Sequence, residues 1–318
     1  METILVTGGA GFIGSHVCDK LLEKKKKVIC LDNFNDYYDP EIKRKNILHN
    51  LKNKNYVLIK ADIRDYDKLK EVFKNYKPNK VVHLAARAGV RPSLENPFIY
   101  EETNVNGTLN LLELSKDYKV KNFVFASSSS VYGNNKKVPF SEDDKTDNAI
   151  SPYAATKKAG EVLCYTYSYL YNLNSSCLRF FTVYGPRGRP DMAPYMFTKN
   201  ILEGKPIKVY GDGSSKRDYT YVSDVVSGII AALEKNFKYE IFNLGNSNTV
   251  SLNELIKTIE EITGKKAIIK REKMPKGDVP LTYADITKSK RLLGYEPKTN
   301  IKEGMQKFYE WYKEVFKI

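Results

Sequence analysis

The sequence predicts an α/β protein whose first part folds as a doubly wound parallel sheet and whose last part forms a smaller α/β lobe. Short apolar runs alternate with segments of helical length up to about residue 180, the order expected of a parallel sheet with helices on both faces. A glycine-rich turn follows the first apolar run. Beyond Gly185 proline and glycine become frequent and the elements shorter. A chain of 318 residues can bury a core in each of two lobes.

The elements follow from the period of the apolar residues. Apolar runs bounded by turn residues indicate buried strands, and apolar positions three or four apart indicate helices. For the large sheet we expect strands at 3–6, 28–31, 56–59, 81–86, 122–126, 176–181 and 240–244, and helices at 13–22, 66–76, 97–117 and 153–171. For the smaller lobe we expect helices at 195–202, 252–263 and 302–316, and strands at 207–210 and 217–222. Residues 1–182, completed by the strand at 240–244, are the predicted Rossmann domain, and residues 183–318 form most of the second lobe.

The first turn has the spacing of a dinucleotide-binding motif. Gly8, Gly11 and Gly14 are arranged as G-x-x-G-x-x-G between the first strand and the first helix. In such a turn the glycines allow a tight bend, a close approach to a pyrophosphate and close packing of helix on strand. Asp32 ends the second strand, where a carboxylate can accept hydrogen bonds from the adenosine ribose and repel a 2′-phosphate. NAD is therefore favoured over NADP, although the nearby Lys43 leaves NADP open.

A group of hydroxyls follows the strand at 122–126. Four serines, Ser127 to Ser130, come directly after it, and Tyr153 and Lys157 lie one turn apart at the start of the helix at 153–171. Hydroxyls at the end of a strand, facing a tyrosine and a lysine, suit proton transfer from a bound alcohol. The same Tyr-x-x-x-Lys spacing also begins at Tyr56, Tyr66, Tyr76, Tyr132, Tyr195 and Tyr309, which we interpret as surface pairs.

Composition excludes several classes of protein. The net charge is +14, but basic residues are spread along the chain and interleaved with acids, so we expect no nucleic-acid partner. No apolar run reaches membrane-spanning length, and no secretory segment precedes Thr3. The four cysteines lack metal-ligand spacing, so we expect no metal site and a cytoplasmic protein with reduced thiols. His83 is interpreted as a core residue.

These residues together resemble the extended short-chain dehydrogenases/reductases that modify nucleotide sugars. The glycine turn, Asp32, the serines, the Tyr153–Lys157 pair and the segment from Arg217 to Asp224 all match in order. Within that family the chain looks most like UDP-glucuronate 4-epimerases. The narrower likeness is carried by the stretches 31–40, 86–91 and 180–192, although Arg187 stands where many relatives have tryptophan.

The resemblance implies a reversible conversion of UDP-glucuronate to UDP-galacturonate through a 4-keto intermediate, with NAD held permanently. It implies Tyr153 as the base on the 4-hydroxyl and Ser128 as its hydrogen-bonding partner. Lys157 would hold the nicotinamide ribose and, with the oxidised nicotinamide, lower the pKa of Tyr153. It also implies a homodimer formed by the helices around Leu109 and Leu163. The implied cofactor-binding residues are Gly8, Gly11, Phe12, Ile13, Gly14, Asp32, Asn33, Lys43, Asp62, Ile63, Leu84, Ala85, Ala86, Asn104, Tyr153 and Lys157.

The sugar carboxylate is the special difficulty of such a reaction. The 4-keto intermediate of a glucuronate is a β-keto acid, which loses carbon dioxide when its carboxylate stands perpendicular to the ketone plane. Related decarboxylases and dehydratases carry acids in the serine cluster, where this chain has Ser129 and Ser130. We expect Ser130, Thr182 and Arg189 to hold the carboxylate. The implied substrate-binding residues are Arg91, Ser129, Ser130, Thr182, Arg189 and Arg217, with Arg217 on the diphosphate and Arg91 on either sugar or phosphate.

Two other interpretations stay open at this point. One is an enzyme of the same fold acting on a related substrate, namely a UDP-glucose or UDP-N-acetylglucosamine 4-epimerase, or a UDP-glucuronate decarboxylase. The other belongs to a different class, a nucleotide-binding sensor or nucleic-acid-associated regulator. The intact Tyr153, Lys157 and Ser128 disfavour a sensor, because a sensor needs no proton relay.

Overall fold

A computed structural model of the protein shows one seven-stranded sheet in which all neighbouring strands are parallel. The structure describes residues 1–273 and 279–318. In spatial order the strands are β11 (Tyr239–Leu244), β6 (Ser175–Phe180), β5 (Asn122–Ser128), β4 (Lys80–His83), β1 (Thr3–Thr7), β2 (Lys27–Asp32) and β3 (Tyr56–Lys60). The chain runs outward from β1 through β2 and β3, then crosses back to β4 on the other side of β1. Ligands bind beyond the C-terminal ends of the strands at such a switch point.

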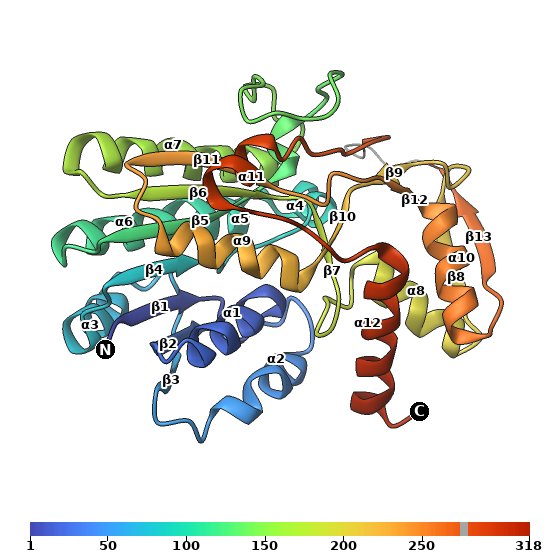
Figure 1. The fold of residues 1–318 in the computed structure, drawn as a ribbon, viewed down its shortest axis with the longest axis horizontal. Helices are drawn as coiled ribbons and strands as arrows, with labels where there is room; N and C mark the ends of the chain where they lie inside the picture. Colours follow the sequence, from blue (N-terminus) through green and yellow to red (C-terminus); the bar gives the residue numbers. More distant parts are fainter. Residues whose placement is uncertain (274–278) are drawn as a thin grey trace.

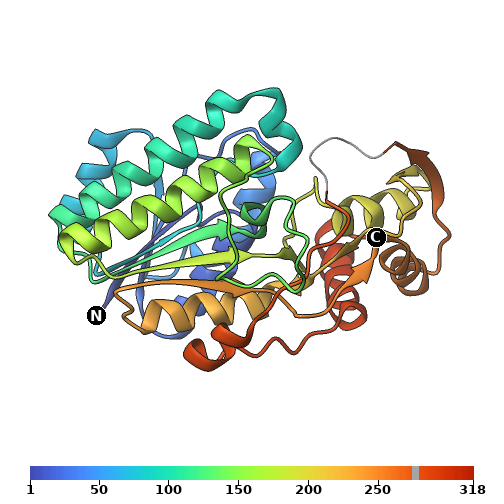
Figure 2. The same cartoon turned by 90° about the horizontal axis from the view of Figure 1, so that it is seen from above.

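Helices cover both faces of this sheet (Figure 1, Figure 2). On one face lie α3 (Tyr66–Tyr76), α4 (Val90–Glu95), α5 (Pro97–Glu101), α6 (Gly107–Asp117) and α7 (Pro152–Tyr171), with a π-helical segment (Glu102–Asn106) joining α5 to α6. On the other face α1 (Phe12–Glu23) packs against α9 (Val222–Glu234), with α2 (Pro40–Ile47) beside α1 and α11 (Thr287–Leu293) beside α9. No helix within the described residues is both long and apolar enough to cross a membrane.

The two faces of the sheet belong to separate hydrophobic cores. Side chains alternate between the faces of a strand, so Ile4 and Val6 of β1 pack toward α1 and α9, while Leu5 packs toward α3, α6 and α7. Both faces are covered, and β1 is buried along its whole length. This explains why its sequence is a continuous apolar run rather than an alternating one.

A smaller lobe stands at the C-terminal edge of the sheet (Figure 1). Its helices are α8 (Ala193–Leu202), α10 (Leu252–Thr263) and α12 (Ile301–Phe316). Three two-stranded sheets accompany them: β7 (Thr182–Tyr184) with β10 (Tyr219–Tyr221), β8 (Pro206–Tyr210) with β13 (Ile268–Glu272), and β9 (Lys216–Arg217) with β12 (Val250–Ser251). The strand at 240–244 joins the large sheet as predicted. The division of the chain at residue 182 stays a prediction.

The structure differs from the predicted elements in several places, and α2, α4, α11, β12 and β13 are observed elements that were not predicted. The strand predicted at 217–222 is two short strands followed by α9, a helix absent from the prediction. Nine of the thirteen residues of α9 are buried, and the other four, at 223, 227, 231 and 234, recur at the helical period that the prediction overlooked. The strand predicted at 81–86 ends at His83, and the helix predicted at 97–117 is interrupted by the π-helical segment.

A buried ion pair fixes α7 to the sheet. Arg179 of β6 and Glu161 of α7 are each only 1% exposed. Arg179 Nε donates to Glu161 Oε1 at 2.8 Å and Nη2 donates to Oε2 at 2.9 Å. The Ser127 hydroxyl also donates to Glu161 Oε1, at 2.6 Å. The helix that carries Tyr153 and Lys157 is therefore held directly against the ends of β5 and β6.

Replacing Arg179 by alanine is expected to lower the free energy of unfolding by about 3–5 kcal/mol, because it leaves the Glu161 carboxylate buried without its partner. Lys158 offers a matched control, since it lies 3.5 Å from the same carboxylate but is 30% exposed. Lys158→Ala should cost less than about 1 kcal/mol. Denaturant unfolding of the three proteins measures both losses, and equal losses would contradict this role of the pair.

Candidate functional site

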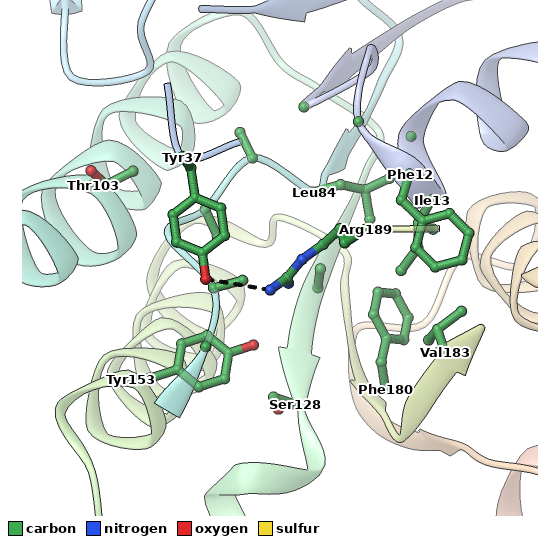
Figure 3. A pocket seen from close by; sticks show the side chains of 18 of the residues that line it. Phe12, Ile13, Tyr37, Leu84, Thr103, Ser128, Tyr153, Phe180, Val183 and Arg189 are labelled. Carbon is green, nitrogen blue, oxygen red and sulfur yellow. Dashed lines mark hydrogen bonds between the residues drawn. The ribbon is translucent and has the colours of Figure 1, made fainter. Parts of the chain in front are cut away.

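A cavity of about 350 Å³ opens at the C-terminal ends of the strands of the large sheet (Figure 3). It is bounded by the turn after β1, the loop after β2, the segment after β4, the serines after β5, the start of α7 and the loop after β7. Most of the residues predicted for the site line it, namely Gly8, Gly11, Phe12, Ile13, Gly14, Asp32, Asn33, Lys43, Ile63, Leu84, Ala85, Ala86, Ser128, Ser129, Ser130, Tyr153, Lys157, Thr182 and Arg189.

The glycine turn forms one end of the cavity. Gly8 has a φ of +67°, and a Cβ on Gly14 would lie 2.1 Å from the Gly8 carbonyl oxygen, so a side chain cannot fit at Gly14 without moving the turn. The first turn of α1 carries no acidic residue, and among the described residues no side chain caps its start at Gly11. Its backbone N–H groups therefore face the cavity with the partial positive charge of the helix N-terminus, which suits a pyrophosphate.

Asp32 lies at the far side of this turn and is buried. Its Oδ2 accepts from the backbone N–H of Ala10 at 3.2 Å, and its Oδ1 accepts from Phe34 N at 2.9 Å and from Lys43 Nζ at 3.2 Å. Lys43, itself buried, thus forms an ion pair with Asp32 at the edge of the cavity. A lysine whose charge is already paired attracts a 2′-phosphate less strongly than an unpaired one would.

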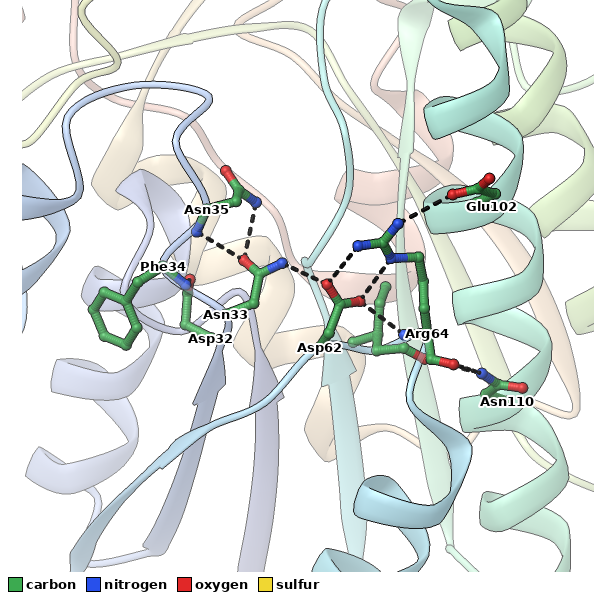
Figure 4. A network of polar contacts seen from close by, with 9 residues as sticks. Asp32, Asn33, Phe34, Asn35, Asp62, Arg64, Glu102 and Asn110 are labelled. Carbon is green, nitrogen blue, oxygen red and sulfur yellow. Dashed lines mark hydrogen bonds and ion pairs between the residues drawn. The ribbon is translucent and has the colours of Figure 1, made fainter.

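Asp62 supports the wall of the cavity, and its predicted contact with the adenine stays a prediction. It stands outside the set of described residues that line the cavity. Its carboxylate accepts from Asn33 Nδ2 at 2.9 Å and from Arg64 Nη2 at 3.0 Å, and Arg64 also donates to Glu102 (Figure 4). This network links the loops after β2 and β3, and it holds Asn33 and the neighbouring Ile63 at the cavity wall.

The serines and α7 form the opposite end of the cavity. Ser151 caps α7 by accepting from Ala154 N at 3.1 Å, and Pro152 occupies the first helical turn, so the helix starts immediately before Tyr153. Tyr153 and Ser128 face the same space (Figure 3). Lys157 Nζ donates to the Ala126 carbonyl oxygen at 2.7 Å.

The pKa of Tyr153 is raised by the protein alone, whereas the predicted lowering included the positive charge of the oxidised nicotinamide. Burial raises it above its ordinary value, while a hydrogen bond from Ser128 and the charge of Arg189 act in the opposite direction. The cation that acts on the phenol in this structure is thus Arg189 rather than Lys157. Burial lowers the pKa of Lys157 itself to about 7, because the charged ammonium loses its hydration.

Arg189 enters the cavity from the loop after β7. Figure 3 shows its guanidinium pointing toward the hydroxyl of Tyr37, on the side where Tyr153 and Ser128 lie. It forms an ion pair with Asp191. Tyr37, whose hydroxyl lies 3.4 Å from Arg189 Nη2, lines the cavity as well. Sequence reasoning missed Tyr37 and Asp191 as site residues, although both lie in stretches that carry the family likeness.

Three other predicted residues stand outside the set of described residues that line the cavity. Asn104 is buried behind it and bonds both backbone groups of Arg87 and the Thr156 hydroxyl, which braces the loop after β4 against α7. The Arg91 guanidinium lies 4.2 Å from the ring centre of Tyr210 on β8. Arg217 lies on β9 and donates to the Lys216 carbonyl oxygen.

Comparison with known proteins agrees with this geometry. Residues 5–308 match the family model of GDP-mannose 4,6 dehydratase. A UDP-glucuronate 4-epimerase of Thermodesulfobacterium geofontis is 50% identical over 100% of this chain and 98% of its own length. The crystal structure of UDP-glucuronic acid 4-epimerase from Bacillus cereus, in complex with UDP-glucuronic acid and NAD, superposes with a TM-score of 0.93 at 38% identity, covering 98% of this chain and 99% of that one.

The chain belongs to the GDP-mannose 4,6-dehydratase family of extended short-chain dehydrogenases/reductases. The predicted resemblance and the predicted α/β fold are thereby confirmed. Members of this family differ in the sugar that they bind. The UDP-glucose 4-epimerase of Thermotoga maritima, solved with UDP-glucose, superposes with a TM-score of 0.91 at 38% identity and covers 99% of both chains. Discrimination among sugars therefore has to come from individual side chains around the cavity.

The lowered pKa of Lys157 predicts how the stability of this family member depends on pH. The folded-state value of about 7 lies below the ordinary value of 10.5, so the unfolded chain binds more protons than the folded chain between these limits. The free energy of unfolding should then rise with pH across this window, by about 1.4 kcal/mol per unit from this group. The measurement is the stability difference between the wild type and Lys157→Met from pH 7 to pH 10. A difference that stays constant would show that Lys157 is not desolvated as the structure indicates.

Proposed function

We propose that this protein is an NAD-dependent UDP-glucuronate 4-epimerase that interconverts UDP-glucuronate and UDP-galacturonate through a 4-keto intermediate. The observation that carries the proposal is the arrangement of one cavity, in which a dinucleotide-binding turn, a Ser128–Tyr153 pair and a wall formed by Thr182 and Arg189 face the same space. The names and ligands of the relatives support the same activity.

NAD is the cofactor that the turn and Asp32 fit. The N–H groups at the start of α1 would hold its pyrophosphate, and the Asp32 carboxylate would accept from the adenosine ribose, with Ile63 and Leu84 against the rings. When bound, NAD supplies the acceptor for the hydride of sugar C4 and later returns that hydride to the other face. Every other step falls to side chains of this chain.

Tyr153 is the proposed base. Its phenolic oxygen would take the proton of the 4-hydroxyl while Ser128 hydrogen-bonds the same oxygen and keeps it aimed at Tyr153. Burial opposes the phenolate, so positive charge at the site must offset that cost. Arg189 supplies part of this charge in the structure, and Lys157 would act from the other side through the nicotinamide ribose. Tyr153 and Lys157 lie on α7, and Ser128 lies at the end of β5, so these three side chains are held by regular elements.

Thr182, Ser130 and Arg189 are the proposed site for the sugar carboxylate. All three line the cavity. Hydroxyl and guanidinium donors can hold both carboxylate oxygens near the plane of the 4-ketone, where the C5–C6 bond is poorly aligned for loss of carbon dioxide. Ser129 and Ser130 also leave no acid at the serine cluster to deliver a proton for that side reaction. Arg217 remains the proposal for the diphosphate, and Arg91 remains a proposal for either the sugar or the phosphate.

A second candidate is 4-epimerisation of a neutral UDP-hexose. The ion pair between Arg189 and Asp191 favours it, because it cancels the formal charge of the arginine at the sugar end of the cavity. Decarboxylation of UDP-glucuronate is the third candidate reaction. To separate the three, the conversion of UDP-glucose, the conversion of UDP-glucuronate and the release of carbon dioxide are measured side by side.

The proposal includes a cytoplasmic homodimer that associates through α6 and α7. Five large apolar side chains of α7 are exposed, namely Val162 (53%), Tyr165 (52%), Tyr169 (68%), Leu170 (56%) and Tyr171 (48%). Leu109 and Leu163, around which the interface helices were predicted, are themselves partly buried against the core. A second copy of α7 would cover the exposed face. A particle mass in solution of twice 36.4 kDa tests this assembly.

Incubation with UDP-glucuronate is expected to yield UDP-galacturonate, with UDP-glucose converted far more slowly. Tyr153→Phe should lower kcat by about 10²–10⁴-fold, since it removes the proton acceptor but keeps the ring. Product analysis by chromatography measures both. Preferential conversion of UDP-glucose, or full activity in Tyr153→Phe, would contradict the proposed function.

Arg189→Ala is expected to weaken binding of UDP-glucuronate by about tenfold and to leave binding of UDP-glucose nearly unchanged, because a charge-assisted hydrogen bond is lost only with the uronate. Some of the substrate should also be decarboxylated and leave as a UDP-4-keto-pentose. The measurements are KM for each sugar and the yield of pentose. Unchanged binding together with no pentose would remove Arg189 from the carboxylate site.

A further inference from the structure

Behind Arg189 stands a carboxylate that is not among the described residues lining the cavity. Asp191 Oδ1 accepts from Arg189 Nε at 3.0 Å, and Asp191 Oδ2 accepts from Arg189 Nη2. The hydroxyl of Tyr37, which comes from the loop after β2, donates to Asp191 Oδ2 at 3.3 Å and accepts from Arg189 Nη2 at 3.4 Å. The three side chains therefore form a closed triangle at the edge of the cavity, which we call the Arg189 triangle.

The triangle fixes the guanidinium in two ways. Asp191 binds the edge formed by Nε and Nη2, a bidentate geometry that sets the plane of the group. The ring of Tyr37 lies against it, with Arg189 Cζ 5.4 Å from the ring centre, while Arg87 Cζ lies 5.9 Å from the same centre. Within residues 1–273 and 279–318, no hydrogen-bond partner of Arg189 Nη1 is found. Nη1, the end of the guanidinium that is left for a ligand, therefore points in a defined direction.

We propose that Asp191 and Tyr37 are positioning residues that aim Nη1 of Arg189 at the C5 carboxylate of the sugar and so protect the 4-keto intermediate from decarboxylation. This inference rests on the proposed function. A guanidinium on a long flexible side chain could bind a carboxylate in many orientations, including the perpendicular one that permits loss of carbon dioxide. Holding its Nε–Nη2 edge removes most of those orientations, because only one end remains for the ligand.

The reaction that the triangle would prevent has a definite balance. Oxidation at C4 transfers a hydride from the sugar to NAD and a proton to Tyr153. If the carboxylate turns, the C5–C6 bond breaks and carbon dioxide leaves. The electron pair of that bond stays on C5 as the enolate of the 4-ketone, which takes up one proton. The products are a UDP-4-keto-pentose, carbon dioxide and NADH. Each decarboxylation therefore leaves one reduced cofactor, which absorbs at about 340 nm.

The loop that carries Arg189 makes a second ion pair, and weakening that pair is a matched control for loosening of the loop. Arg187, two residues before Arg189, forms an ion pair with Asp19 at 2.7 Å, and both residues stand outside the described lining of the cavity. Asp19→Asn weakens an ion pair on the same loop without touching the triangle. Asp191→Asn removes the charge of the triangle, and Tyr37→Phe removes only its hydroxyl.

The experiment uses the full-length protein with bound NAD and UDP-glucuronate labelled at C6. The measured quantity is labelled carbon dioxide released per epimerisation, with absorbance near 340 nm followed in parallel. We expect this ratio to rise about tenfold in Asp191→Asn and about threefold in Tyr37→Phe, as expected for loss of a charge-assisted and a neutral hydrogen bond. The double variant should release no more carbon dioxide per epimerisation than Asp191→Asn alone, since both residues act through one guanidinium. Asp19→Asn should behave as the wild type.

Several results would overturn the inference. If Asp19→Asn and Asp191→Asn released equal amounts of carbon dioxide per epimerisation, the decarboxylation would be due to loosening of the loop as a whole. A lower KM for UDP-glucuronate in Asp191→Asn, without leakage, would make Asp191 a repelling charge instead of a positioning one. Unaltered calorimetric binding of UDP, which lacks the sugar, shows that each variant is folded, so a wild-type ratio in folded Asp191→Asn refutes the proposal. If the wild type epimerises neither sugar, the proposed function itself fails, which is a distinct outcome.

Discussion

The site depends on the attachment of α7 to the end of β5. Lys157 Nζ donates to the Ala126 carbonyl oxygen, and four residues further along the same helix Glu161 accepts from the Ser127 hydroxyl and from Arg179. These contacts fix the distance between the helix that carries Tyr153 and the strand end that carries Ser128. Because charged groups buried without partners are costly, the helix has few alternative positions.

The same burial that gives rigidity works against the chemistry, and the site offsets this cost with positive charge. A buried phenol keeps its proton, and a buried ammonium gives its proton up, so neither Tyr153 nor Lys157 is prepared for proton transfer by burial alone. Arg189 brings a charge that is held in place by Asp191. The arginine thereby serves two proposed purposes, since it favours the phenolate and faces the sugar carboxylate.

The sequence predicts those parts of the site that are local in the chain. The glycine turn, Asp32, and the spacing of Tyr153 and Lys157 each lie on a single element, so a short pattern is enough to find them. Contacts between distant segments leave no such pattern: Tyr37 meets Asp191 across 154 positions, and Lys157 bonds a carbonyl oxygen rather than the tyrosine. The helix α9 is a different case, since its non-buried positions recur at helical spacing and the prediction overlooked this local pattern.

The central claim is that one cavity brings a bound sugar to Tyr153 with its carboxylate toward Thr182 and Arg189. The most direct test is the structure of the protein crystallised with NAD and UDP-glucuronate. We expect the 4-hydroxyl within about 3 Å of the Tyr153 oxygen, and the carboxylate in contact with Arg189 and the Thr182 hydroxyl. A sugar whose carboxylate points away from Arg189, or whose 4-hydroxyl lies beyond the reach of Tyr153, would contradict it.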